Sequence, residues 1–194
     1  MTTDAREKVI GPEDAGLRGF VWYAWPWVNW LLPVYVVFHG FLGNGGWESV
    51  MLMMGSPVII PAAGLLGSLP RFIMRKSGHR YAPWPLLPAL FVLWWSWLTA
   101  AMAMPAVGDS GSDPSILSGF VSGGLSEGFE NGVMAASILL GALAWVLVLG
   151  LASSLPIGAG ERPPAPLLGR LSFFVVPLIL VAVVVIGGLV GDHA

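Results

Sequence analysis

The chain has 194 residues, of which 56% are hydrophobic and only 10% are charged, and its formal net charge at pH 7 is −2. Because a soluble domain is about 25% charged, this chain has too few charges to cover a globule of its size with a solvated surface. Its apolar content also excludes a disordered chain, which leaves a protein whose solvent is lipid.

Five stretches are long and apolar enough to cross a bilayer, since a spanning helix needs about 20 apolar residues. None of them contains Asp, Glu, Lys or Arg, and none alternates like a barrel strand. The sequence therefore predicts an all-α integral membrane protein, a bundle of five transmembrane helices. A polar tail over 1–19 precedes the transmembrane domain over 20–191, and 192–194 form a second tail. The predicted spans are residues 20–41, 50–69, 84–104, 132–151 and 171–190.

The basic residues predict the orientation of these spans. All nine Lys and Arg residues lie before the first span, between the second and third, or between the fourth and fifth. The alternate segments 42–49, 105–131 and 191–194 contain none. By the positive-inside rule, the N-terminus is cytoplasmic and the C-terminus lies outside. The short loops and the absence of a cleavable signal are typical of a multi-pass protein of a plasma membrane, here a bacterial inner membrane.

The connections on the outer side differ in length. Segment 42–49 is short and rich in glycine, so the first two spans are predicted to be antiparallel neighbours. Within segment 105–131, Asp113 and Pro114 form a helix start. A short amphipathic helix over 114–129 on the outer interface is therefore predicted. Its apolar side chains recur every four residues, at Leu117, Val121, Leu125 and Phe129.

Prolines interrupt the second span. Pro57 and Pro61 each remove a backbone hydrogen bond in its middle, which lipid cannot replace. A plain kink is one interpretation. The other is an unwound segment over 55–64, as in the broken helices that build binding sites in transporters.

Tryptophans at depth in the third and fourth spans also have two interpretations. They either pack at helix contacts and face acyl chains, or they form the wall of a cavity for a flat or lipidic ligand. These residues are Trp94, Trp95, Trp97 and Trp145.

Glycines recur every four residues in two places, a spacing that lets helices approach closely. This pattern predicts contacts with other membrane subunits or self-association, besides the contacts with the lipid bilayer. The glycines are Gly124, Gly128 and Gly132 before and in the fourth span, and Gly187 and Gly191 at the end of the fifth.

One group of residues predicts a soft-metal site in the outer half of the spans. Thioether and imidazole groups are ligands that suit copper(I), and the chain has no cysteine to compete with them. Packing of the methionines between helices is the alternative. The predicted ligands are His39, Glu48, Met51, Met54, Met102 and Met104.

The sequence contains no catalytic motif: no zinc-binding His-Glu-x-x-His, no phosphate loop with Lys, no Gly-x-Ser-x-Gly and no acidic residue within a span. Nucleic-acid binding is not expected, because the basic residues are few and lie at the membrane ends. We therefore expect a non-enzymatic, tryptophan-rich membrane protein that acts as an accessory, assembly or structural subunit through helix contacts. The alternative is a small facilitator or binding protein for an apolar or soft-metal ligand, built on the kinked second helix.

Overall fold

The computed structural model describes residues 16–42, 45–108, 111–121 and 123–155, which form four long helices and a small cap. Helix α1 spans Gly16–Phe38, α2 spans Trp47–Lys76, α3 spans Leu86–Met102 and α4 spans Glu127–Ser154. The cap joins α3 to α4. It contains strands β1 (Ala106–Gly108) and β2 (Gly111–Asp113) and the 3-10 helix η2 (Ser118–Phe120).

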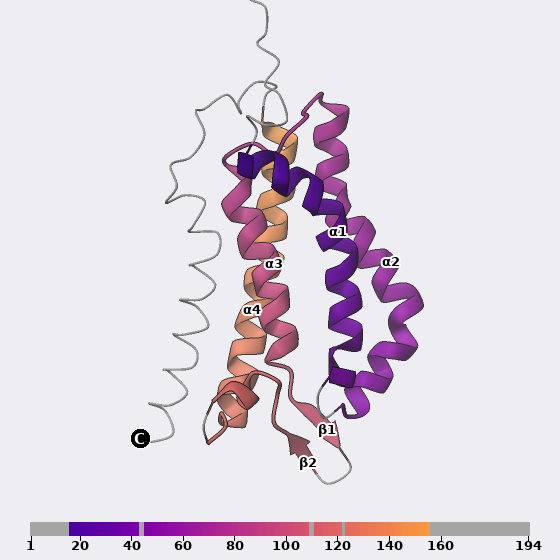
Figure 1. The fold of residues 1–194 in the computed structure, drawn as a ribbon, viewed down its shortest axis with the longest axis vertical. Coiled ribbons are helices and arrows are strands. Elements are labelled where there is room, and N and C mark those ends of the chain that lie inside the picture. Colours follow the sequence, from indigo (N-terminus) through magenta and orange to yellow (C-terminus); the bar gives the residue numbers. More distant parts are fainter. Residues whose placement is uncertain (1–15, 43–44, 109–110, 122, 156–194) are drawn as a thin grey trace, which may run out of the picture.

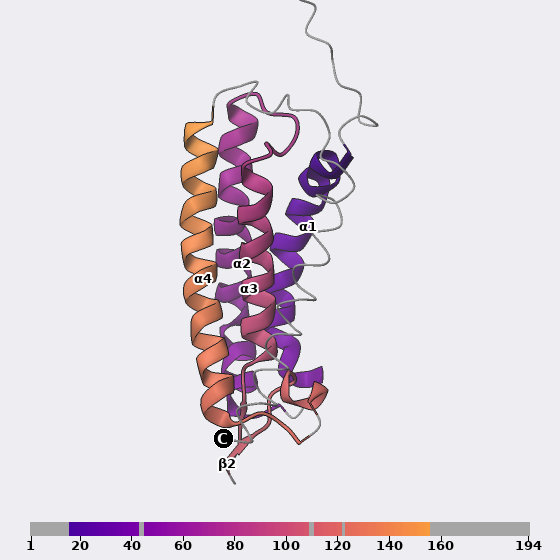
Figure 2. The same ribbon diagram turned by 90° about the vertical axis from the view of Figure 1, so that its left-hand side faces the viewer.

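The helices run up and down and form a bundle (Figure 1). Around the bundle, α1 contacts α2, α2 contacts α4, α4 contacts α3 and α3 contacts α1. Figure 2 shows α3 and α4 side by side along their length. As predicted, α1 and α2 are antiparallel neighbours, and the 3-10 helix η1 (His39–Leu42) directly follows α1.

The first four predicted spans each coincide with a helix, although the bounds differ. Among the described helices, α2 and α4 are long and apolar enough to cross a membrane. Helix α4 begins five residues before the predicted span, because the Ser126 side chain caps it by accepting a hydrogen bond from the Phe129 N–H at 3.4 Å. The predicted fifth span, 171–190, and the tail residues 1–15 and 192–194 lie outside the described residues.

Helix α2 remains helical through all its prolines, so of the two interpretations of residues 55–64 the unwound segment is not the one observed. The helix bends instead, and Figure 1 shows its middle bowed away from α1. Pro57 and Pro61 lie in this middle part, and proline is the usual cause of such a bend, because its ring clashes with the preceding turn.

The predicted amphipathic helix over 114–129 is also wrong. Apart from the three-residue η2, the described part of this segment is irregular until α4 begins. Gly123 and Gly124 have positive φ angles of 101° and 82°, which a right-handed helix cannot contain. Two of the apolar side chains that suggested this helix, Leu117 and Val121, are nevertheless buried.

Two carboxylates fasten the cap to the bundle. Glu130 on α4 is 2% exposed and accepts hydrogen bonds from the Ser115 N–H at 3.1 Å and the Ser115 hydroxyl at 2.6 Å. Glu48 at the start of α2 accepts from the Val107 N–H of β1 at 2.8 Å. In the hairpin, Ala106 of β1 pairs with Asp113 of β2. The two carboxylates therefore connect the hairpin and the residues that follow it to α2 and to α4.

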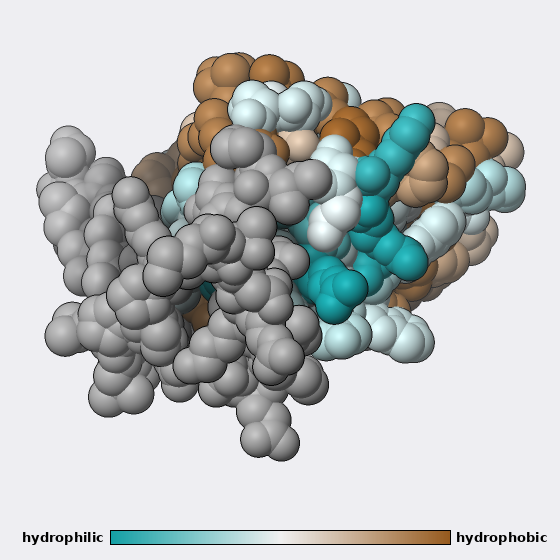
Figure 3. All heavy atoms as spheres, turned by 90° about the horizontal axis from the view of Figure 1, so that it is seen from above, coloured by the Kyte–Doolittle hydropathy of each residue, from teal (hydrophilic) through white to brown (hydrophobic). Residues whose placement is uncertain are grey.

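Charged residues separate to opposite ends of the bundle. The described basic residues lie at the start of α1, at the end of α2 and in the loop before α3, while the acidic ones lie at the start of α2, in β2 and at the start of α4. In the antiparallel bundle these are opposite ends (Figure 1). Viewed from the basic end, hydrophilic side chains of the described residues gather in one area, with apolar side chains above and to the right of it (Figure 3).

The Glu130 contacts are testable by a single substitution. Glu130→Ala leaves the buried N–H and hydroxyl of Ser115 without an acceptor, so we expect the free energy of unfolding to fall by about 2 kcal/mol. Circular dichroism of the purified protein during thermal unfolding measures this loss. Glu127→Ala removes the same charge from an exposed position on the same helix turn, and it should cost only about 0.5 kcal/mol. Equal losses for the two variants would contradict the assignment.

Candidate functional site

The middle of the bundle contains a cavity of about 680 Å³ that all four helices line. This volume is typical of small-molecule sites, which measure about 300–1,000 Å³. The wall is apolar except for one amide side chain and the indole nitrogens. The lining residues are Asn29, Leu32, Pro33, Val36, Ile59, Ala62, Ala63, Leu66, Gly67, Leu93, Trp94, Trp97, Ala142, Trp145 and Val146.

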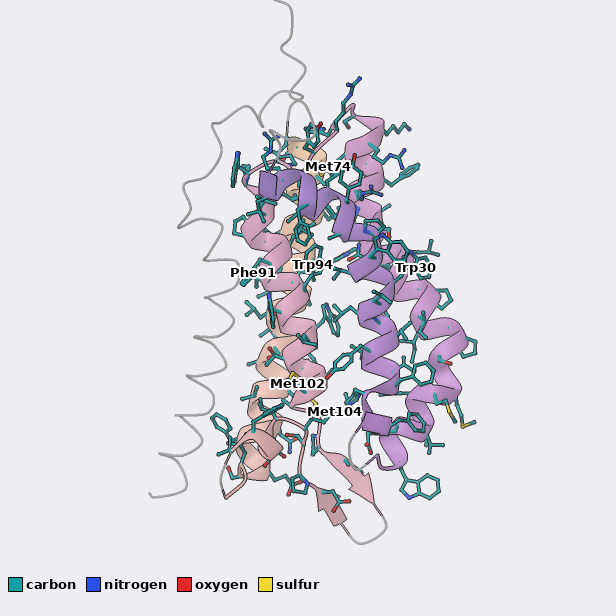
Figure 4. The ribbon with its side chains drawn as sticks, viewed as in Figure 1. Trp30, Met74, Phe91, Trp94, Met102 and Met104 are labelled. Atoms are coloured by element: carbon teal, nitrogen blue, oxygen red, sulfur yellow. The ribbon has the colours of Figure 1, made fainter. Side chains whose placement is uncertain are left out.

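Three of the four deep tryptophans contribute to this wall. Trp94 and Trp97 come from α3 and Trp145 comes from α4. Figure 4 shows Trp94 projecting from α3 toward α1. Trp95 is different, because it packs against Phe91 with ring centroids 6.1 Å apart and does not line the cavity. The spacing of Trp94 and Trp97 places both side chains on one face of α3, whereas Trp95 lies on another.

Asn29 is the polar group of the cavity. Its side chain is 6% exposed, and its Oδ1 accepts a hydrogen bond from Trp94 Nε1 at 3.2 Å. Its Nδ2 makes no hydrogen bond to any residue that the structure describes. A buried N–H group without an acceptor costs about 1–3 kcal/mol. Asn29 therefore brings to the cavity wall an amide group whose Nδ2 is buried and has no acceptor in the described chain.

Glycines on α2 make room for α1 at this level. A Cβ atom at Gly67 would lie 2.9 Å from Asn29 Cγ, and one at Gly64 would lie 2.7 Å from the Trp30 ring. These distances are shorter than van der Waals contact, so neither glycine tolerates a side chain without movement of α1. The two glycines are three residues apart and thus share the face of α2 that packs on α1.

A proline on α2 explains the position of Trp145. In a helix, the carbonyl of Leu66 would accept from the N–H of residue 70, but residue 70 is proline and has no N–H. Trp145 Nε1 donates to this carbonyl instead, at 3.1 Å. At the next residue of the same helix, the Gly67 carbonyl accepts from Trp25 Nε1, also at 3.1 Å. The indoles thus supply donors to α2 from both of its neighbours.

Among the predicted metal ligands, His39 and Glu48 lie close to the connection between α1 and α2. Both side chains already form hydrogen bonds within the protein. His39 is 3% exposed and donates from Nδ1 to the Val36 carbonyl at 2.7 Å. The Glu48 carboxylate accepts from the Gly46 N–H at 3.0 Å and from the Ser49 hydroxyl at 3.2 Å, besides its bond to β1.

The predicted methionine ligands divide between two places. Met51 and Met54 are 70% and 74% exposed on the outer surface of α2. Met102 and Met104 lie at the lower end of α3 and just after it (Figure 4). The described chain contains no group of three or more His, Asp or Glu residues suited to a metal ion. The six residues are therefore not gathered around one enclosed point, and metal binding itself stays a prediction.

The predicted glycine contacts also differ from the glycines that pack. A Cβ atom at Gly128 or Gly132 would meet nothing within 4 Å in the described chain, so these two glycines form no helix contact there. Gly124 lies before α4, and a Cβ atom at this residue would lie 3.3 Å from Ser118 Oγ. Gly187 and Gly191 lie outside the described residues. Self-association through these glycines stays a prediction.

The sequence indicated that the deep tryptophans could line a cavity, but it did not indicate that Trp94 bonds to Asn29 or that Trp145 bonds to the Leu66 carbonyl. Asn29 is the only Asn or Gln within the predicted spans, which was an available signal for a buried polar contact. The pairing of Gly67 with Asn29 and of Pro70 with Trp145 had no comparable signal, because both pairs join helices whose contacting faces are set by the tertiary structure.

A double-mutant cycle tests the bond between Trp145 and the Leu66 carbonyl. Trp145→Phe leaves this carbonyl unpaired, and we expect a loss of about 1–3 kcal/mol in the free energy of unfolding. In a Pro70→Ala background the new N–H at residue 70 can pair with the carbonyl, so the same change should cost about 1 kcal/mol less. Thermal unfolding of the four proteins measures this coupling. Equal costs of Trp145→Phe in the two backgrounds would show that the indole bond does not replace the missing N–H.

Known proteins do not assign a function to the cavity. No family model matches the chain, and no curated protein or solved structure matches it significantly. The function of the chain is therefore inferred from its own residues.

Proposed function

We propose that this chain is a multi-pass membrane protein that binds a flat, apolar molecule carrying a hydrogen-bond acceptor such as a carbonyl oxygen. The single observation that carries the proposal is the cavity, whose one amide side chain, Asn29, has a buried Nδ2 without a hydrogen-bond partner among the described residues. The described residues that line the cavity include no Asp, Glu, His, Lys or Arg. The proposed role is accordingly binding rather than catalysis.

The surface and the charges of the bundle support the membrane assignment. The outer faces of α2 and α4 are apolar, with Val58, Leu139 and Leu143 each at least 60% exposed. In water such faces would be unfavourable, whereas lipid accommodates them. The separation of basic and acidic residues to opposite ends of the bundle supports a cytoplasmic basic end. We propose a fifth span over 171–190 and a location in the plasma membrane of a bacterium.

Cysteine labelling tests the orientation, because the natural chain contains no cysteine. Val107→Cys places a thiol on the half-exposed side chain of β1, and Lys76→Cys places one on an exposed residue at the basic end. In intact cells, a membrane-impermeant maleimide should label residue 107, and it should label residue 76 only after lysis. Labelling of residue 76 in intact cells without labelling of residue 107 would reverse the orientation. Labelling of both would contradict a spanning bundle.

The composition of the cavity defines the ligand class. Indole rings stack on flat π-systems, and Trp94, Trp97 and Trp145 offer such surfaces from two helices. Aliphatic side chains from α1 and α2 complete the wall and suit an alkyl chain or ring. A buried N–H donor discriminates strongly for a ligand with an acceptor, because an acceptor-free ligand leaves the donor unpaired.

Quinone binding provides a direct test, since decylubiquinone is flat and apolar, carries two carbonyl groups and quenches tryptophan fluorescence. We expect saturable quenching by decylubiquinone in nanodiscs that contain the purified chain. Asn29→Leu should weaken binding about tenfold, the value of one hydrogen bond in a desolvated site. Ala63→Trp should abolish saturation, because it fills part of the cavity.

The matched control is Ala136→Trp, which adds the same side chain at an exposed position of α4 that does not line the cavity. It should bind the quinone as the natural chain does. Quenching that rises linearly in all variants would reflect partition into lipid and would refute the proposed site. Unchanged affinity of Asn29→Leu would refute the role of the amide.

An accessory or assembly subunit is the second proposed function. It is favoured by Gly128 and Gly132 of α4, beside which no described residue lies within 4 Å of the Cβ position. Because glycine has no side chain, a helix of another subunit could approach α4 closely there. The native mass of the complex extracted in mild detergent separates the two functions. A stoichiometric protein partner supports the second, and a monomer that retains a small apolar molecule supports the first.

A further inference from the structure

A second cavity, of about 600 Å³, lies at the basic end of the bundle, between the start of α1 and the end of α2. Three arginines and a histidine line it, and two aromatic rings of α1 form its side wall. These residues are Arg71, Arg75, Arg80, His79, Trp22 and Tyr23. It is separate from the tryptophan-lined cavity, with which it shares no lining residue.

The end of α2 is built so that basic residues from two segments converge. The Gly78 N–H donates to the Arg75 carbonyl at 3.1 Å, and the His79 N–H donates to the Met74 carbonyl at 3.0 Å. Gly78 has a φ angle of 87°, a conformation that favours glycine. This pair of bonds with a left-handed glycine resembles the Schellman ending of a helix. It turns the chain back, so that His79 and Arg80 line the same cavity as Arg71 and Arg75.

Arg71 is held in position before any ligand binds. Its guanidinium carbon lies 4.9 Å from the centroid of the Trp22 ring, a cation–π contact. Trp22 in turn packs edge-on against Trp25, with ring centroids 6.2 Å apart and planes at 89°. Trp25 is fully buried. The position of Arg71 is therefore fixed by the core of the bundle rather than by solvent.

Buried polar atoms of this cavity lack partners in the described chain. The Nε of Arg71 and both ring nitrogens of His79 are buried and form no hydrogen bond to any residue that the structure describes. None of the lining residues within the described ranges is acidic. The described carboxylates lie at the far end of the bundle, at the starts of α2 and α4 and in β2. Three guanidinium charges thus share a cavity to which the described residues contribute no carboxylate.

We propose that this cavity binds a phosphate group. A guanidinium presents its N–H donors as a planar fork that matches two phosphate oxygens, and several arginines together supply enough donors for the remaining oxygens. The aromatic wall holds Arg71 in place, so little side-chain freedom is lost on binding. A membrane phospholipid and a soluble phosphate compound carry the same group. The proposal concerns a different site from the apolar ligand cavity and does not depend on that ligand.

The experiment uses the full chain in neutral detergent with two probes. Inorganic phosphate is titrated by calorimetry, and phosphatidylglycerol is added to the micelles and its retention measured by native mass spectrometry, with a diacylglycerol, which lacks a phosphate group, for comparison. Binding of phosphate alone indicates a soluble source, and selective retention of phosphatidylglycerol without phosphate binding indicates a lipid headgroup. Either result supports the proposal. Binding of neither probe, or equal retention of the two lipids without phosphate binding, would overturn it.

Variants then assign the binding to the cavity. For the probe that binds, Arg71→Gln should lower the affinity about tenfold, because it removes a charged donor at a half-buried position. Arg75→Gln tests the same cavity at an exposed side chain whose loss cannot disturb the core, and it should also weaken binding. Lys76→Gln is the matched control, since it removes one charge from the next residue, which does not line the cavity. An equal loss for Lys76→Gln would show attraction to general surface charge and would overturn the proposed site.

Discussion

Helices α1 and α2 approach so closely at Gly64 and Gly67 that the side chains of α1 occupy the space a Cβ atom would fill. This close approach determines where Asn29 lies, and Asn29 determines the chemistry of the central cavity. If α1 stood farther away, the amide would lose its place opposite Trp94 on α3. The absence of two side chains on α2 is therefore the condition on which the position of the candidate site depends.

The remaining polar atoms of the bundle follow one rule: a group removed from water needs a partner within the protein. Indole nitrogens provide many of these partners. Trp25 and Trp145 donate to carbonyls of α2, and Trp94 donates to Asn29. The abundance of tryptophan thus has a structural role beyond apolar bulk, since each of these rings fills space and also satisfies an acceptor on a neighbouring helix. The amide nitrogen of Asn29 is an exception, because it has no partner among the described residues.

The sequence predicted the helices better than the contacts between them. The first four apolar stretches form helices because their length and composition leave few alternatives, and the glycine-rich connection correctly predicted that α1 and α2 are antiparallel. The cap was mispredicted, because the regular spacing of Leu117 and Val121 resembles a helix face, whereas Gly123 and Gly124 interrupt any helix there. The tryptophan wall was one of two interpretations of the sequence. Its pairing with the amide required knowledge of which helix faces meet.

The bond between Trp145 and the Leu66 carbonyl also limits how the bundle can move. A slide of α4 along α2 by one helical turn would displace the indole by about 5.4 Å, well beyond hydrogen-bond reach. Because Pro70 has no N–H, the carbonyl would then have no donor from its own helix. The bond therefore acts as a stop on shear between these two helices. Access to the central cavity has to come from motions of other helix pairs or from side-chain rotation, with α2 and α4 moving as one unit.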